Sequence, residues 1–190
     1  TVGTVRIDTN GGSITSTTGI LTGTSYTLAN TSPNTASISA ILAGSGVTLT
    51  QSGTGTSTLS GANTYTGGTS IANGTLTAGR AASGSITNGP FGTNTITVGS
   101  SGTLDVANYT VLNAINLNGG TITTSTGSTG AITGGITLGA ATSYLNATTG
   151  TTLTISSAIS DASSAYALTI GASGKTGTVS LTQANTYSGG

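Results

Sequence analysis

The chain has very few ionisable side chains. Its 190 residues include three Lys and Arg, three Asp and Glu, no histidine and no cysteine. Without cysteine there is no disulfide framework and no thiolate metal site. Zero net charge removes the long-range attraction that nucleic acids and anionic membranes exert on basic proteins. We therefore expect no nucleic-acid partner, and we expect no membrane insertion of this segment because no apolar run approaches the roughly 20 residues that span a bilayer.

The same scarcity limits chemistry. The only carboxylates are Asp8, Asp105 and Asp161, far apart in sequence, and Asp105 is predicted to point outward. Glycoside cleavage needs a close carboxylate pair, and Ca²⁺ needs six to eight oxygens that include several carboxylates. Lys175, the sole lysine, is predicted to lie on a solvated turn rather than in a cross-link to an asparagine. We expect no enzyme activity, no catalytic residue, no metal site and no cofactor.

What the chain does have is glycine, with 32 residues, and many short runs in which apolar and small polar residues alternate. Alternation places the apolar side chains on one face of a strand. The starts of five such runs are 15 to 21 residues apart, at Ile96, Ile115, Ile136, Leu153 and Leu168. This spacing predicts an all-β solenoid with two or three strands per coil. A coil of roughly 20 residues gives about nine coils and a rod of roughly 45 Å.

Neutral polar residues suit such stacking. Like positions of successive coils lie about 4.8 Å apart, so charges would repel along a ladder, whereas threonine and asparagine can form hydrogen bonds along it. Many threonines form T-x-T patterns, namely Thr64, Thr66, Thr75, Thr77, Thr93, Thr95, Thr97, Thr121, Thr123, Thr152 and Thr154. Their spacing in the sequence is irregular, whereas a face that matches an ice lattice needs regular ranks.

An internal repeat organises the chain. The stretch from Leu59 to Gly79, LSGANTYTGGTSIANGTLTAG, returns in part 122 residues later, from Leu181 to Gly190. Leu59 and Tyr65 are expected to be apolar anchors, and Asn63 is expected to bond its own backbone at a turn. The pair Gly67 and Gly68 is expected to provide positive φ where the chain turns again.

At these residues the chain resembles the autotransporter-associated β-strand repeat, whose pattern is roughly L-x-G-x-N-T-Y-x-G-G-T-x-I-x-x-G-x-L. The second copy departs from it at Gln183 and stops before its second half. The structural positions of the repeat are Leu59, Asn63, Tyr65, Gly67, Gly68, Ile71, Gly74 and Leu76, then Leu181, Asn185, Tyr187, Gly189 and Gly190. The resemblance implies a right-handed parallel β-helix in the passenger region of a bacterial surface protein, and it implies no activity.

Two functions remain open from the sequence. The first is an extracellular structural segment such as a stalk, surface layer or fibre. The second is an adhesin or an ice- or glycan-binding module that uses a flat Thr-rich face, with a surface glycan as its partner. We favour the structural function because the T-x-T pairs are irregular. Residues 1–190 are expected to form a single solenoid segment that continues end to end, within a longer chain or by stacking of copies, since neither end resembles a cap.

Overall fold

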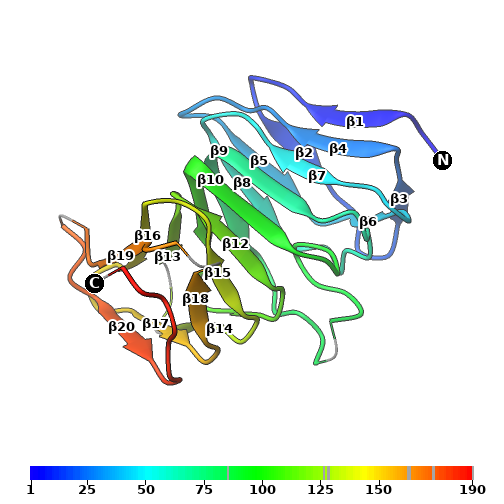
Figure 1. Ribbon diagram of the computed structural model, residues 1–190. Helices are drawn as coiled ribbons and strands as arrows, with labels where there is room; N and C mark the ends of the chain where they lie inside the picture. Colours follow the sequence, from blue (N-terminus) through cyan, green and yellow to red (C-terminus); the bar gives the residue numbers. More distant parts are fainter. Residues whose placement is uncertain (85, 126, 128, 162–163, 173, 190) are drawn as a thin grey trace.

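The computed structural model describes residues 1–84, 86–125, 127, 129–161, 164–172 and 174–189. Among them every regular element is a β-strand, and all strand ladders are parallel. The strands stack as a β-solenoid of about seven turns, with the two termini at opposite ends of the stack (Figure 1). The predicted all-β parallel β-helix is therefore confirmed.

Each coil passes through up to three ladders, which we call face 1, face 2 and face 3. Face 1 has the order β1-β4-β7-β9-β10-β12-β15-β18. Its strands are β1 (Thr4–Ile7), β4 (Ser25–Leu28), β7 (Leu49–Gln51), β9 (Thr69–Ala78), β10 (Ile96–Asp105), β12 (Ile115–Asn118), β15 (Ile136–Leu138) and β18 (Ile159–Asp161).

Face 2 shares the two long strands, because β9 and β10 continue around the corner from face 1. Its other strands are β2 (Gly12–Ile14), β5 (Thr35–Ile38), β8 (Thr56–Leu59), β13 (Thr121–Thr124), β16 (Thr142–Ala147) and β19 (Ala167–Ile170). Face 3 contains β3 (Ile20–Thr22) with β6 (Ile41–Ala43), and β11 (Thr110–Val111), β14 (Thr129–Ile132), β17 (Thr152–Ile155) and β20 (Thr178–Leu181).

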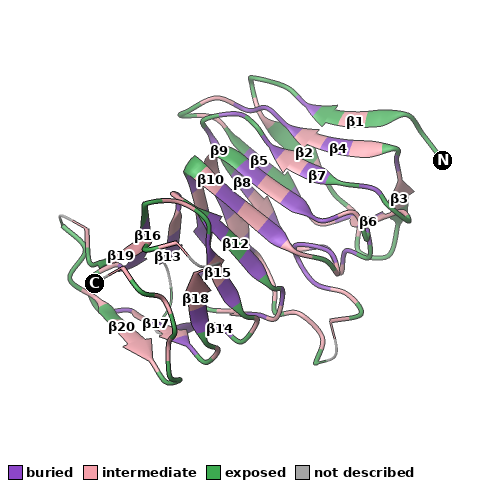
Figure 2. Cartoon of the chain, in the orientation of Figure 1, coloured by how far each residue is buried: buried purple, intermediate pink, exposed green. Residues whose placement is uncertain are grey.

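The core consists of apolar side chains that stack along these ladders. On face 1, Ile96 pairs with Ile115, Ile115 with Ile136, and Ile136 with Ile159, and all four are buried. Buried and exposed residues alternate along the strands, as the sequence pattern predicts (Figure 2). Burial of each such side chain contributes about 1.5–3 kcal/mol. The core is therefore a continuous column along the solenoid.

The predicted coil count was wrong. Leu153 lies in β17 on face 3 and Leu168 in β19 on face 2, so neither continues the Ile96 ladder. The residue that follows Ile136 in this ladder is Ile159, which lies 23 positions later. Registers on face 1 advance by 19 to 27 residues per coil because corner loops differ in length. Longer coils give about seven turns in place of nine.

Candidate functional site

The first copy of the repeat is an interlocked part of the core. Leu59 and Tyr65 are fully buried, as expected. Asn63 is also fully buried, but it does not bond its own backbone. Its Oδ1 accepts a hydrogen bond from Leu42 N at 2.8 Å, and its Nδ2 donates to Pro90 O at 2.6 Å. The side chain thus links the coil before it to the coil after it.

Tyr65 forms a second link inside the core. Thr69 Oγ1 donates its one hydroxyl proton to Phe91 O at 2.9 Å. Thr69 Oγ1 must therefore be the acceptor in its 2.7 Å hydrogen bond with the Tyr65 hydroxyl, which is the donor. The ring of Tyr65 lies 6.0 Å from that of Tyr26 in the neighbouring coil, tilted by 54°. Burial raises the pKa of the Tyr65 phenol well above its ordinary value. The phenol therefore stays protonated and available as a donor.

The two glycines that follow have different roles. Gly68 has φ +92°, as predicted for a turn. Gly67 does not have positive φ, and this part of the prediction was wrong. A Cβ at Gly67 would lie 2.5 Å from Gly46 O and 2.6 Å from the carbonyl of Val47, so close approach of the preceding coil explains the glycine.

The second half of the motif lies in β9. Ile71 and Leu76 are fully buried, on face 1 and face 2 respectively, and pair with Val98 and Leu104 of β10. Gly74 separates them with φ +62° at the corner between the faces. These positions match the predicted inward pattern.

The second copy repeats the asparagine link on another face. Leu59 lies in β8 on face 2, whereas Leu181 lies in β20 on face 3. Asn185 Oδ1 nevertheless accepts from Ile159 N of the preceding coil at 2.9 Å. The motif is therefore a local device for joining a coil to its predecessor, independent of face.

The remaining residues of this copy have a looser environment. Tyr187 is half-buried and packs against the core, and Gly189 bridges to Ala167. A Cβ at Gly189 would lie 2.3 Å from Tyr166 O, the same kind of close approach as at Gly67. Gly190 lies outside the described residues. Only one neighbouring coil packs on this last turn, which explains the weaker burial.

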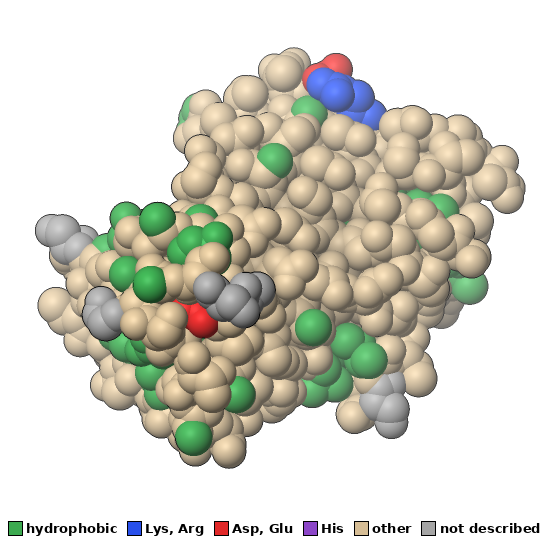
Figure 3. Space-filling view, viewed as in Figure 1, with side chains coloured by type: hydrophobic (Ala, Val, Ile, Leu, Met, Phe, Trp, Pro, Cys, Tyr) green, Lys and Arg blue, Asp and Glu red, His purple; other side chains and the backbone are tan. Residues whose placement is uncertain are grey.

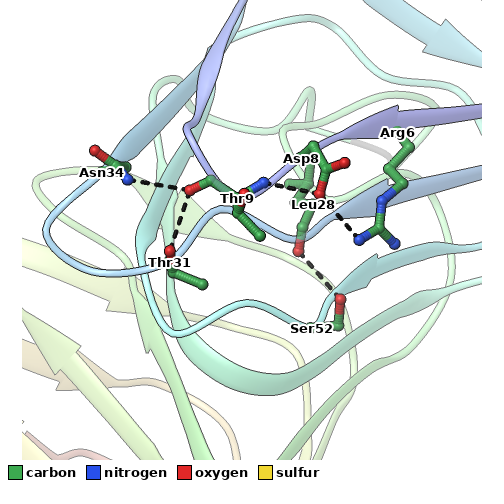
Figure 4. A network of polar contacts seen from close by, with 7 residues as sticks. All are labelled: Arg6, Asp8, Thr9, Leu28, Thr31, Asn34 and Ser52. Atoms are coloured by element: carbon green, nitrogen blue, oxygen red, sulfur yellow. Dashed lines mark hydrogen bonds and ion pairs between the residues drawn. The ribbon is translucent and has the colours of Figure 1, made fainter.

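Hydroxyl and amide side chains also join coils at the corners. Thr31 Oγ1 and Asn34 Nδ2 both donate to Thr9 O, at 3.2 and 3.1 Å (Figure 4). Ser52 Oγ donates to Leu28 O at 3.4 Å. The hydrogen bonds expected between threonine and asparagine residues of successive coils are thus formed here from side chains to backbone carbonyls. These bonds explain how a chain with so little charge is held together outside its core.

The T-x-T pairs do not form one face. Thr75 and Thr77 lie on face 2, as do Thr121 and Thr123, whereas Thr97 lies on face 1 and Thr152 on face 3. On face 2, however, threonines stand in two regular ranks despite their irregular spacing in sequence. One rank contains Thr35, Thr56, Thr75, Thr103 and Thr121. The other contains Thr58, Thr77, Asp105 and Thr123, followed by Asn146.

Most members of these ranks line a hollow of about 460 Å³, which we call the threonine groove. The groove is lined by Thr56, Thr75, Thr77, Thr103, Asp105, Thr121, Thr123, Ser125, Asn146 and Lys175. Lys175 is exposed, as expected for a turn, but it also borders this groove. The predicted T-x-T set did not include four members of the ranks, Thr35, Thr56, Thr58 and Thr103. A signal was present in G-T-L-T at residues 74–77, G-T-L-D at 102–105 and G-T-I-T at 120–123.

Asp105 stands in the outward-facing rank but is only 4% exposed, contrary to the solvent-facing position expected. Ser125 covers it, because Ser125 N donates to Asp105 Oδ1 at 3.1 Å and the Ser125 hydroxyl donates to Oδ2. Ala107 N donates to Oδ1 at 2.9 Å. The carboxylate therefore accepts three hydrogen bonds and holds Ser125 at the end of β13.

The three aspartates lie on different coils. Asp8 follows β1, Asp105 ends β10 and Asp161 ends β18, so at least three coils, on the order of 14 Å, separate any two. Hydrogen bonds from the backbone N–H groups of Thr9 and Ser188 lower the pKa values of Asp8 and Asp161, respectively. Within the described part of the chain, no group of three His, Cys, Asp or Glu residues could hold a metal ion.

Charge is equally sparse on the surface. The ion pair of Arg6 and Asp8, at 3.1 Å, is the only one among the residues that the structure describes. The face shown in Figure 3 is nearly all neutral. None of the described segments is a helix long and apolar enough to cross a membrane.

Comparison with known families identifies the repeat. Residues 49–78 and 176–190 match the family model described as passenger-associated-transport-repeat. The first segment covers residues 59–78 of the first copy, and the second segment contains the whole second copy. The expected resemblance to an autotransporter passenger repeat is therefore confirmed at those positions. Neither the curated proteins nor the solved structures gave a match to the chain.

Proposed function

We propose that this β-solenoid, with its two passenger-associated-transport repeats, is a structural segment of a bacterial surface protein. It acts as a spacer in a stalk, surface layer or fibre outside the cell. The observation that carries the proposal is the continuous apolar column joined coil to coil by buried side chains such as Asn63. Such a column gives length and stiffness without chemistry, and we propose no catalytic role for it.

The two ends of the solenoid support continuation beyond each edge. The large apolar side chains that are most exposed are Val2 at 49%, Ile20 at 67% and Ile170 at 47%. Val2 precedes the edge strand β1, Ile20 lies in the edge strand β3, and Ile170 lies in the edge strand β19. Unpaired strand edges with apolar side chains favour another parallel coil. That coil is either a further part of a longer chain or a second copy.

Electron microscopy of native material, labelled with an antibody against the chain, tests the structural role. We expect labelled elongated rods at the cell surface. Compact particles, or label confined to the cytoplasm, would contradict the proposal.

Sedimentation of the purified chain tests stacking of copies. We expect assembly that Ile20→Asp and Ile170→Asp weaken, whereas Thr64→Asp, at an exposed position away from both ends, leaves it unchanged. A chain that stays monomeric, and that has no neighbouring unit at either end in the native protein, would overturn end-to-end continuation.

A further inference from the structure

We infer that the threonine groove on face 2 is a binding site for a neutral oligosaccharide. The groove brings two parallel ranks of hydroxyl groups together in a hollow. Successive hydroxyls in a rank lie about 4.8 Å apart, the spacing of neighbouring strands. A flexible polyhydroxylated chain that lies along the solenoid axis meets a donor and acceptor at each coil.

Three threonine hydroxyls that line the groove make no hydrogen bond within the described part of the fold. Corner threonines such as Thr31 and Thr148 donate to carbonyls of the preceding coil. In contrast, Thr75, Thr103 and Thr121 are half-buried, and their Oγ1 atoms make no hydrogen bond to the described residues. Their hydrogen-bonding capacity is therefore directed into the groove.

One further side chain indicates an unmet partner. Thr123 is only 8% exposed and lines the groove, and its Oγ1 has no hydrogen-bond partner among the described residues. A buried hydroxyl without a partner is costly. A ligand hydroxyl that enters between Asp105 and Asn146, the neighbours of Thr123 in its rank, supplies the missing hydrogen bond.

The charges of the groove favour a neutral ligand. One aspartate and one lysine line it, so its formal charge is zero. The Asp105 carboxylate is buried and already accepts three hydrogen bonds from Ser125 and Ala107, so it presents little free negative charge to a cationic ligand. The hollow also distinguishes this site from an ice-binding face, which is flat, and Asp105 interrupts the second threonine rank.

Isothermal titration calorimetry with the neutral cellohexaose and maltohexaose and the anionic hexagalacturonate, together with an array of neutral glycans, tests the inference. We expect the whole chain to bind at least one of the neutral glycans. The double variant Thr103→Val, Thr121→Val keeps β-branched side chains and removes two hydroxyls, so we expect binding to weaken at least about fivefold. The control Thr50→Val, Thr97→Val changes two half-buried threonines on face 1, outside the groove, and should bind like the native chain.

Three outcomes would overturn the site. They are the absence of binding to every neutral glycan, equal binding by the two double variants when circular dichroism shows both folded, and binding confined to hexagalacturonate and abolished by salt. A failure here leaves the structural proposal intact, because that proposal concerns the column and the ends of the solenoid.

Discussion

Asn63 Oδ1 accepts a hydrogen bond from the backbone N–H of Leu42 at 2.8 Å, although 21 residues separate the two in sequence. The same amide donates to Pro90 O, 27 residues later. One side chain thus holds three successive coils in register at the centre of the repeat.

Replacement of Asn63 by alanine should lower the free energy of unfolding by about 2–4 kcal/mol, because it leaves two buried backbone groups unpaired. Asn185→Ala should cost about 1 kcal/mol or less, since Asn185 is half-buried and makes one such bond. Denaturant unfolding measures both, with Thr64→Ala at an exposed neighbouring position as the control. Equal stability of Asn63→Ala and Thr64→Ala would contradict the role of this amide.

Gly67→Ala should destabilise the chain by more than about 1 kcal/mol, because the added Cβ would meet the backbone of Gly46 and Val47 in the coil below. Gly135→Ala is the matched control, since a Cβ at Gly135 would meet no atom within 4 Å and the backbone there does not have a positive φ. Thermal unfolding of the two variants tests this. If both variants unfold at the same temperature as the native chain, the coil spacing at Gly67 is not fixed by backbone contact.

Tyr65→Phe removes the donor to Thr69 and should cost about 0.5–1.5 kcal/mol at pH 8. The pKa of Tyr65 is raised above its ordinary value of 10.0 by burial, so folding disfavours its ionisation. The contribution of the protonated Tyr65 phenol to the free energy of unfolding is fully present below pH 10 and is lost as the pH rises above 10. Denaturant unfolding at pH 8 and above pH 10 should therefore show a larger alkaline loss for the native chain than for Tyr65→Phe. Parallel losses in the two proteins would refute the assignment.

Asp161 should make attachment of the last residues sensitive to acid. Ser188 N donates to Asp161 Oδ2 at 2.7 Å and Ser188 Oγ at 2.9 Å. The pKa of Asp161 is lowered by the backbone hydrogen bond from Ser188, so its contribution is present above the ordinary pKa of 3.8 and is lost as the pH falls through the lower folded value. We expect faster amide exchange at Ser188 below about pH 3.8, corrected for intrinsic exchange. In Asp161→Asn, which cannot titrate, this change should disappear, and its persistence would exclude Asp161 as the cause.

Much of the fold was readable from the sequence because side-chain direction in a strand is a local property. Alternation such as Ile96-Thr-Val98 fixes which side chains face inward, and the core ladders confirm it. The motif positions Leu59, Tyr65, Ile71 and Leu76 were predicted to be buried for the same reason, and all are.

The partners of these residues were not readable from the sequence. Ile136 pairs with Ile159 and not with Leu153, because a coil has three faces and corner loops of different lengths. Those loops also bring Thr75, Thr103 and Thr121 into one rank, although unequal numbers of residues separate them. Covering of Asp105 by Ser125 is likewise a contact between coils.

The sequence by itself determined the all-β solenoid, the identity of the repeat and the inward side of most strands, since these depend on residue type and on a period of two. Only the tertiary structure decided the coil count, the neighbours joined by Asn63 and the threonine groove. Each of these is set by the register between coils, and that register depends on how much chain every corner takes up before the next strand begins.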